Sequence, residues 1–263
     1  TQEHSSAASD VYKRQKSERS QRPERAQTRS VLSRSLDSSS PLISSRRNPL
    51  VKRLRTLATR AGREAEGLLL LEGTHLLQEV LRQGNAPEEI IATEAWLQGH
   101  SALAARCSQA RWRIVTDEVL RAALTTVTPD GVACLSPLDR LPTVPPELDF
   151  LLVLDRIQDP GNLGTLLRTA LAADVNAVWM GAGVDPLGTK VLRASAGALL
   201  QLPHQRFGPS EAMAISQLQQ ELKQLVALGV QVVATLVPDA TKADPPVPYW
   251  DLDWTLPTAL VLG

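Results

Sequence analysis

The segment from Leu151 to Leu171 constrains the fold of this chain more than any other. It opens with a continuous apolar run, breaks at the turn Asp159-Pro160-Gly161, and restarts with leucine and alanine at helical spacing. An apolar run without polar alternation is typical of a parallel strand that is covered on both faces. Proline and glycine favour a tight turn. The segment therefore predicts a strand, a turn and a helix of an α/β fold.

The same alternation of strand and helix extends along most of the chain. Its first half predicts an amphipathic helix from Leu50, strands at 67–73, 89–93, 112–115 and 131–135, and helices at 74–82, 95–107 and 117–124. Its second half predicts strands at 150–154, 177–180, 230–236 and 259–262, helices at 162–173, 187–193 and 211–228, and a short segment at 198–202.

Composition divides the chain into a tail and two domains. Residues 1–45 are rich in Ser, Arg and Gln and poor in large apolar residues, so we expect a disordered tail. Within it, Asp10 to Gln15 resembles the translation of a transposon-end sequencing adapter, so roughly the first 15 residues are expected to be non-native. A small α/β domain is expected at 46–136, a proline-rich linker at 137–148 and a second domain at 149–263.

The net charge of zero hides an asymmetry, because residues 1–60 hold 14 Lys and Arg against 5 Asp and Glu. Such a basic arm suits contacts with phosphates, although a solvated tail has the same composition. No apolar run is long enough to cross a bilayer and no signal-peptide pattern opens the chain, so we expect a cytoplasmic protein without a membrane partner. Cys107 and Cys134 are isolated, and we expect neither a disulfide nor a metal site.

The order of residues in 151–171 resembles motif 1 of the SpoU/TrmH branch of the SPOUT RNA methyltransferases. Further segments match the same family in the same order: Arg47 to Lys52, Gly62-Arg63-Glu64, Leu71-Glu72-Gly73, Arg193 to Ala198, Val232 to Thr235 and Thr258 to Gly263. The resemblance thus covers residues 46–263.

The resemblance implies an L30e-like RNA substrate-binding domain followed by an α/β-knot SPOUT methyltransferase domain. It implies S-adenosyl-L-methionine as cofactor, bound near Thr235, Leu236, Leu262 and Gly263, and a homodimer that methylates a ribose 2′-hydroxyl of rRNA or tRNA. Because the chain stops where the second motif of the family would open, we expect a methyltransferase domain cut short, with an incomplete knot and no activity.

The resemblance assigns catalytic roles to Arg168 and Asn162. Arginine stays protonated in proteins, so we expect Arg168 to clamp a phosphate or a developing oxyanion and not to act as a general base. Asn162 would add a polar contact at or near the helix N-cap, six residues earlier, so the two side chains do not share a helix face. Capping alone is a sufficient role for Asn162, and solvation alone is sufficient for Arg168.

Basic residues of the first domain are candidates for RNA contact. Lys52 and Arg53 lie on the polar side of the amphipathic helix, where they would contact phosphates unless they are merely solvated. Arg63 and the strand-terminal Glu72 are interpreted as part of an RNA-facing edge, against the alternative that Glu72 only ends its strand. With aromatic residues at 3%, recognition by base stacking is not expected.

Two other functions are weighed against methyl transfer. An RNA-binding fragment or module without catalysis has the same first domain and would lack only the completed cofactor pocket. A Rossmann nucleotide-binding domain is disfavoured because no GxGxxG motif follows the strand at 151–155.

Overall fold

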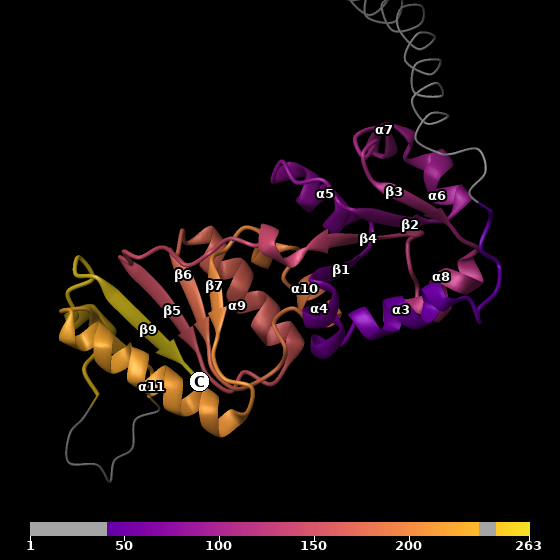
Figure 1. Cartoon of the computed structure of the whole chain (residues 1–263). Helices are drawn as coiled ribbons and strands as arrows, with labels where there is room; N and C mark the ends of the chain where they lie inside the picture. Colours follow the sequence, from indigo (N-terminus) through magenta and orange to yellow (C-terminus); the bar gives the residue numbers. More distant parts are fainter. Residues whose placement is uncertain (1–40, 237–245) are drawn as a thin grey trace, which may run out of the picture.

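The computed structural model describes residues 41–236 and 246–263, which form two α/β domains, each with its own sheet (Figure 1). Most of the predicted tail, including the residues expected to be non-native, lies outside these ranges. Its described end is part of the fold, because Ile43 forms a bridge with Val115. None of the helices within the described ranges is long and apolar enough to cross a membrane.

The N-terminal domain is built on a four-stranded sheet with the order β1-β4-β2-β3. Strands β2 and β3 are parallel, whereas β4 is antiparallel to both of its neighbours. The elements are α3 (Pro49–Leu57), α4 (Arg60–Glu66), β1 (Leu68–Glu72), α5 (Thr74–Arg82), β2 (Glu89–Ala92), α6 (Glu94–Gly99), α7 (Ser101–Ala105), β3 (Arg111–Ile114), α8 (Asp117–Ala123) and β4 (Val132–Pro137).

Both faces of this sheet are covered, so β1, β2 and almost all of β4 are buried, whereas β3 at the edge is partly exposed. Successive side chains of a strand point to opposite faces. Leu68 and Leu70 therefore pack with α3 and α8, whereas Leu69 and Leu71 pack with α5. Burial on both faces is the reason that the strand at 67–73 reads as a run of leucines.

The C-terminal domain has a five-stranded parallel sheet with the order β7-β6-β5-β9-β8. A 3-10 helix η1 (Leu138–Arg140) and the connecting chain lead into it. Its elements are β5 (Phe150–Leu154), α9 (Pro160–Ala172), β6 (Ala177–Met180), α10 (Thr189–Ala194), η2 (Ala198–Leu200), β7 (His204–Arg206), α11 (Glu211–Ala227), β8 (Gln231–Ala234), η3 (Tyr249–Asp251) and β9 (Thr258–Leu262).

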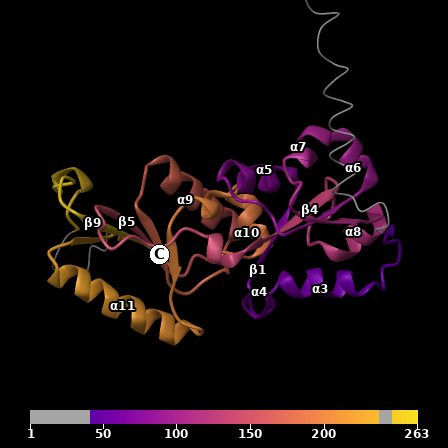
Figure 2. The same ribbon diagram turned by 45° about the horizontal axis from the view of Figure 1, so that its top comes forward.

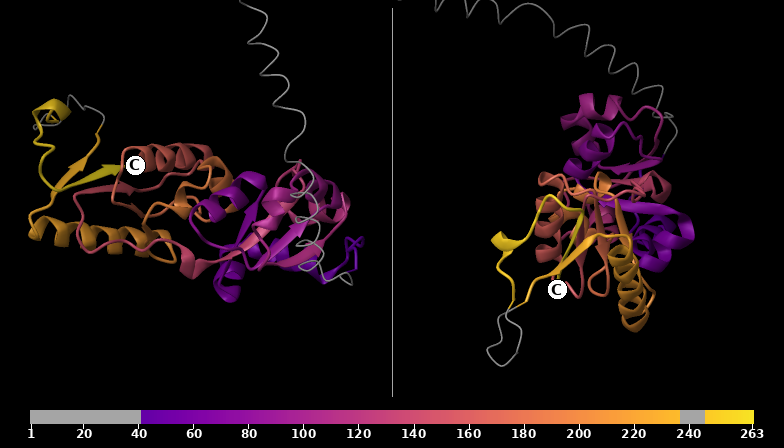
Figure 3. Two further views of the ribbon diagram at one scale, coloured as in Figure 1. Left: turned by 90° about the horizontal axis from the view of Figure 1, so that it is seen from above. Right: turned by 90° about the vertical axis from the view of Figure 1, so that its left-hand side faces the viewer.

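Helices cover this second sheet on both sides (Figures 2 and 3). Leu152 and Leu154 of β5 pack with α9 and α10, while Leu151 and Val153 pack with α11. The mixed α/β class and the parallel sheet are confirmed.

The prediction and the structure differ at several elements. The helix expected at 95–107 is divided at His100 into α6 and α7. Helix α4 and strand β7 were not predicted, since α4 is only seven residues long and β7 is a short polar strand. Helix α9 begins at Pro160 and not at Asn162.

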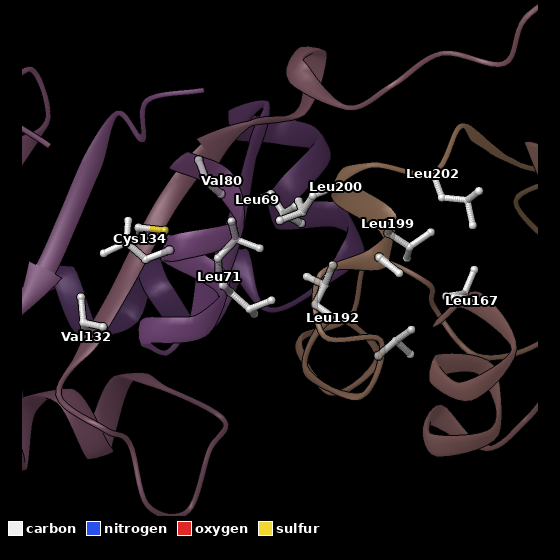
Figure 4. Close-up of a cluster of buried hydrophobic side chains, with 14 of the residues drawn as sticks. Leu69, Leu71, Val80, Val132, Cys134, Leu167, Leu192, Leu199, Leu200 and Leu202 are labelled. Atoms are coloured by element: carbon white, nitrogen blue, oxygen red, sulfur yellow. The ribbon is translucent and has the colours of Figure 1, made fainter. Parts of the chain in front are cut away.

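One apolar cluster continues from the N-terminal domain into the C-terminal domain (Figure 4). Leu69 and Leu71 of β1 belong to it, and so do Leu192 of α10 and Leu199 and Leu200 of η2. Shared burial of apolar side chains stabilises the contact between the domains. The two domains therefore pack against each other as well as following one another in the chain.

Candidate active site

The carboxyl ends of β5, β9 and β8 meet at one edge of the parallel sheet. In the strand order, β5 leads to β6 and β7 on one side and is joined by β9 and β8 on the other, so the order reverses between β5 and β9. Ligands of open α/β sheets bind outside the carboxyl ends of the strands at such a reversal. Leu154 of β5 and Leu262 of β9 end there, which places the candidate site at this edge.

The loop after β5 is fastened to the loop after β6. Asp155 Oδ1 accepts a hydrogen bond of 3.2 Å from the backbone N–H of Ala182, and Arg156 N–H donates to Ala182 O at 2.7 Å. Arg156 holds a left-handed conformation with φ 53°. A non-glycine residue in this conformation is held there by its surroundings, here by the paired loops.

Helix α9 starts with a cap that differs from the one we predicted. Asp159 is the N-cap residue, and its Oδ1 accepts a hydrogen bond of 2.7 Å from the Asn162 N–H. The alternative that Asn162 itself caps the helix is wrong, because Asn162 lies in the first turn. Its exposed side chain borders a hollow of about 570 Å³. The lining residues are Arg156, Ile157, Gln158, Asp159, Asn162, Thr165 and Leu166.

Arg168 is exposed but its guanidinium is not freely solvated. It donates to the carbonyl oxygen of Ala194 at the end of α10 and, over 3.3 Å, to Thr165 Oγ1. Arg168 does not line the hollow that Asn162 borders. Thr165 lies between the two residues, because it lines that hollow and accepts a hydrogen bond from Arg168.

The residues expected to bind the cofactor lie together at the same edge of the sheet. Thr235 N–H donates to Val261 O at 3.1 Å, which places the end of β8 beside β9. Leu236 is 67% exposed, and Leu262 is partly buried. A Cβ added to Gly263 would lie 2.9 Å from the backbone oxygen of Asp155, so the chain approaches β5 closely there.

Lys52 and Arg53 lie on the same helix but in different environments. Lys52 is exposed and lines a hollow of about 400 Å³ together with Arg46, Arg47 and Arg55. Arg53 instead pairs with Glu66 and Glu89, each at 2.7 Å. Burial raises the pKa of Glu89, but hydrogen bonds from Arg53 and Arg113 outweigh it and hold the pKa below its usual range. Arg53 is therefore paired with acidic residues of its own domain, whereas Lys52 is in no ion pair with the residues that the structure describes.

The structure places Arg63 and Glu72 between the domains, and not on an RNA-facing edge. Arg63 is 2% exposed and pairs with Asp185, and Glu72 is 4% exposed and pairs with Arg193. Both partners come from the C-terminal domain, more than a hundred residues away, so these ion pairs could not be predicted from local sequence. This burial argues against RNA contact, and we assign the two residues to the domain interface.

Comparison with known proteins identifies the family of the chain. Residues 149–263 match the SpoU rRNA Methylase family, and residues 48–134 match the MRM3-like substrate binding domain. A tRNA/rRNA methyltransferase of Synechocystis, itself uncharacterized, is 41% identical over 84% of this chain and 77% of its own length. The chain belongs to the SpoU/TrmH family of RNA methyltransferases.

Two further relatives of this methyltransferase carry more specific names. The 23S rRNA (guanosine-2′-O)-methyltransferase RlmP of Bacillus subtilis is 29% identical over 84% of this chain and 81% of its own length. A crystal structure of an AdoMet-bound rRNA methyltransferase from Sinorhizobium meliloti is 26% identical, with a TM-score of 0.66 over 85% of this chain and 80% of that one.

The edge of the sheet fits the cofactor of this family. Exposed Leu236 after β8 supplies an apolar surface, and exposed Gly263 after β9 supplies backbone polar groups. The adenine ring of S-adenosyl-L-methionine has flat apolar faces and polar groups at its rim, so its binding site needs such a combination. Among residues 41–236 and 246–263, no cluster of His, Cys, Asp and Glu has a composition that could hold a metal ion.

Several residues of the site were not found from sequence. Asp155 contacts Ala182 in a loop that is distant in the chain, and Thr165 contacts Arg168 three residues later on the same helix. Only their positions, after a strand and on a helix, could have pointed to them. Arg46 was counted only in the basic arm, and Arg47 only as part of a segment that resembles the family. Lys52, which lines the same hollow, was predicted from the charged face of its helix.

Proposed function

We propose that the protein transfers a methyl group from S-adenosyl-L-methionine to a ribose 2′-hydroxyl of rRNA or tRNA. The observation that carries the proposal is the exposed guanidinium of Arg168, held by Ala194 O and Thr165 Oγ1 on the helix that follows the central strand. The names of the Bacillus subtilis and Sinorhizobium meliloti relatives support the substrate and the cofactor.

Arg168 would bind and polarise the acceptor. Two contacts fix the guanidinium, and its remaining N–H groups stay available to a phosphate or to the oxygen that loses its proton. A fixed cation beside a developing oxyanion lowers the barrier without having to reorient during the reaction. The guanidinium cannot accept the proton itself.

Asn162 and the cofactor-binding residues would orient the reactants. The Asn162 amide offers donors and an acceptor at the rim of the hollow. Thr235, Leu236, Leu262 and Gly263 would hold the cofactor, which supplies an electrophilic methyl group when bound. Transfer of that group requires an in-line approach, so the residues of the chain contribute mainly alignment.

The N-terminal domain, residues 46–136, would dock the RNA. Arg46, Arg47, Lys52 and Arg55 line one hollow, and no ion pair occupies any of them within the part of the chain that the structure describes. Such a group binds the phosphate backbone irrespective of sequence. Lys52 is therefore proposed as an RNA contact. Arg53 lies beside it, but its ion pairs with Glu66 and Glu89 restrain its side chain.

A homodimer and a cytoplasmic location complete the proposal. Exposed Tyr249 and Trp250, each 69% accessible, give the C-terminal domain an apolar surface that a second copy would cover. Sedimentation of the purified protein tests the dimer, with a monomer at micromolar concentration counting against it.

Methyl transfer is tested with the full-length protein, labelled cofactor and total RNA. We expect label in RNA, recovered as 2′-O-methylated nucleosides after digestion. The Arg168→Ala variant should lose on the order of 100-fold or more in rate, because it removes a fixed donor next to the reacting oxygen.

The matched control is Arg111→Ala, an exposed arginine on β3 of the N-terminal domain, away from the carboxyl edge of the second sheet. It should keep the rate of the unmodified protein. RNA binding without any label transfer would instead support the RNA-binding module.

A further inference from the structure

The segment Arg193 to Gly197 connects the candidate catalytic helix to the N-terminal domain. It comprises the end of α10 and the turn that follows, in which Ala196 and Gly197 both have left-handed backbone conformations, φ 50° and φ 79°. Its neighbours on one side are residues of α9, and on the other side residues of β1 and α5.

The contact with α9 leaves almost no space. A Cβ added to Gly164 would lie 2.6 Å from the backbone carbon of Ala194 and 2.8 Å from Ser195 N. Arg168, one turn further along α9, donates to the carbonyl oxygen of Ala194. The backbone of Ala194 therefore determines where the Arg168 guanidinium lies.

The N-terminal domain holds the other side of the same segment. Arg193 donates to Glu72 and, at 3.1 Å, to Thr125 Oγ1. A Cβ added to Gly197 would lie 2.9 Å from Glu79 Cγ. At the start of α10, Thr189 Oγ1 is 2.7 Å from Thr125 Oγ1. Helix α10 is thus fastened at both ends to the N-terminal domain.

The carboxylate of Glu72 is itself fixed by several donors. Thr125 donates to Oε1 from its backbone N–H at 2.8 Å and from its hydroxyl at 2.9 Å. Thr126 donates to Oε2 from its backbone at 3.1 Å and from its hydroxyl at 2.7 Å. A buried carboxylate with this many partners has little freedom, and neither has the guanidinium paired with it.

We propose that Glu72 and Arg193 are positioning residues for methyl transfer. The N-terminal domain holds Arg193 through Glu72, Arg193 holds the end of α10, and the Ala194 carbonyl holds Arg168. This inference rests on the proposed function. It assigns to the substrate-binding domain a second task, the alignment of a residue in the active site.

The test compares Glu72→Gln with Asp185→Asn in the full-length protein. Both remove the charge of one carboxylate in an ion pair between the domains, but Asp185 pairs with Arg63 and Arg206, away from Ala194. Glu72→Gln should slow single-turnover methyl transfer at saturating RNA and cofactor on the order of 10-fold to 100-fold, since a misplaced catalytic group has effects of this size. The RNA Kd should stay within about 2-fold of the unmodified protein.

A double-mutant cycle separates positioning from general loosening. Combined with Arg168→Lys, Glu72→Gln should have little additional effect, because both act through the same guanidinium. A nitrogen-15 NMR signal of the Arg168 Nε–H supplies a readout that needs no turnover, and it should shift in Glu72→Gln but not in Asp185→Asn.

Additive effects in the cycle, an unmoved Arg168 signal, or an equal loss of rate in Asp185→Asn would each overturn the inference. The unmodified protein would still methylate RNA in those cases. If the unmodified protein transfers no methyl group, the proposed function fails, and the NMR comparison still decides whether Glu72 positions Arg168.

Discussion

Arg53 and Lys52 are adjacent cations on α3 with different partners. The side chain of Arg53 reaches Glu66 and Glu89, and Glu89 also accepts a hydrogen bond of 2.9 Å from Arg113. A buried carboxylate between two guanidinium groups holds helix α3 against the sheet. Lys52, one residue earlier, faces solvent.

Glu89→Gln should lower the free energy of unfolding by about 1–3 kcal/mol at pH 7, the range for hydrogen bonds to charged groups. Because the pKa of Glu89 is below its usual range in the folded protein, its stabilisation is fully present above the unfolded pKa of about 4.3. It is lost as the pH falls through the lower folded value. Urea unfolding at pH 7 and pH 3 measures both effects.

The control for this prediction is Glu64→Gln, which removes the exposed pair with Arg60 on α4. Exposed pairs four residues apart contribute only about 0.3–0.5 kcal/mol. If Glu89→Gln costs no more than Glu64→Gln, the pair with Arg53 and Arg113 has no structural role.

At the scale of elements, the close contact between α9 and α10 decides the geometry of the site. Glycine in a helix costs about 1 kcal/mol relative to alanine, so Gly164 weakens α9 by itself. The structure shows that the backbone at the end of α10 occupies the space beside Gly164.

Gly164→Ala should destabilise the protein by about 1–2 kcal/mol, because overpacking against backbone atoms exceeds the gain in helix propensity. It should also slow methyl transfer by displacing Ala194 and with it Arg168. Thermal unfolding and single-turnover rates measure the two effects. Gly99→Ala on α6, where an added Cβ meets nothing within 4 Å, is the control and should be neutral or stabilising.

At the scale of the whole molecule, the basic group and the candidate active site lie on different domains, which pack against each other. The group Arg46, Arg47, Lys52 and Arg55 lies on the N-terminal domain, and the candidate active site lies on the C-terminal domain. The continuous apolar cluster and the ion pairs of Arg63 and Glu72 join them. An RNA would therefore meet two surfaces with a defined spacing.

Lys52→Ala should weaken RNA binding to a similar extent for different sequences and reduce the slope of log K against log salt by about 1, since it removes one phosphate contact. Filter binding at several salt concentrations measures this. Lys223→Ala, an exposed lysine on α11 of the other domain, is the matched control and should leave the slope unchanged. Equal effects of both substitutions would place the RNA elsewhere.

The order of strands and helices could be read from the chain because it depends on local patterns. The apolar runs at 67–73 and 150–154 and the turn Asp159-Pro160-Gly161 predict β1, β5 and the start of α9. Strand β7 escaped prediction, because a three-residue polar strand owes its place to hydrogen bonds with β6 and not to its own composition. The cap of α9 was misassigned for a related reason, since Asp159 and Asn162 are both good capping residues.

By itself the sequence determined the α/β class, the parallel sheet and the membership of the family, since these follow from periodicity and from the order of motifs. Only the tertiary structure decided what each charged residue does. It brought Arg63 to Asp185 and Glu72 to Arg193, and it left Lys52 exposed. Periodicity reports which face of an element is buried, whereas the partner of a charge is chosen when distant segments pack together.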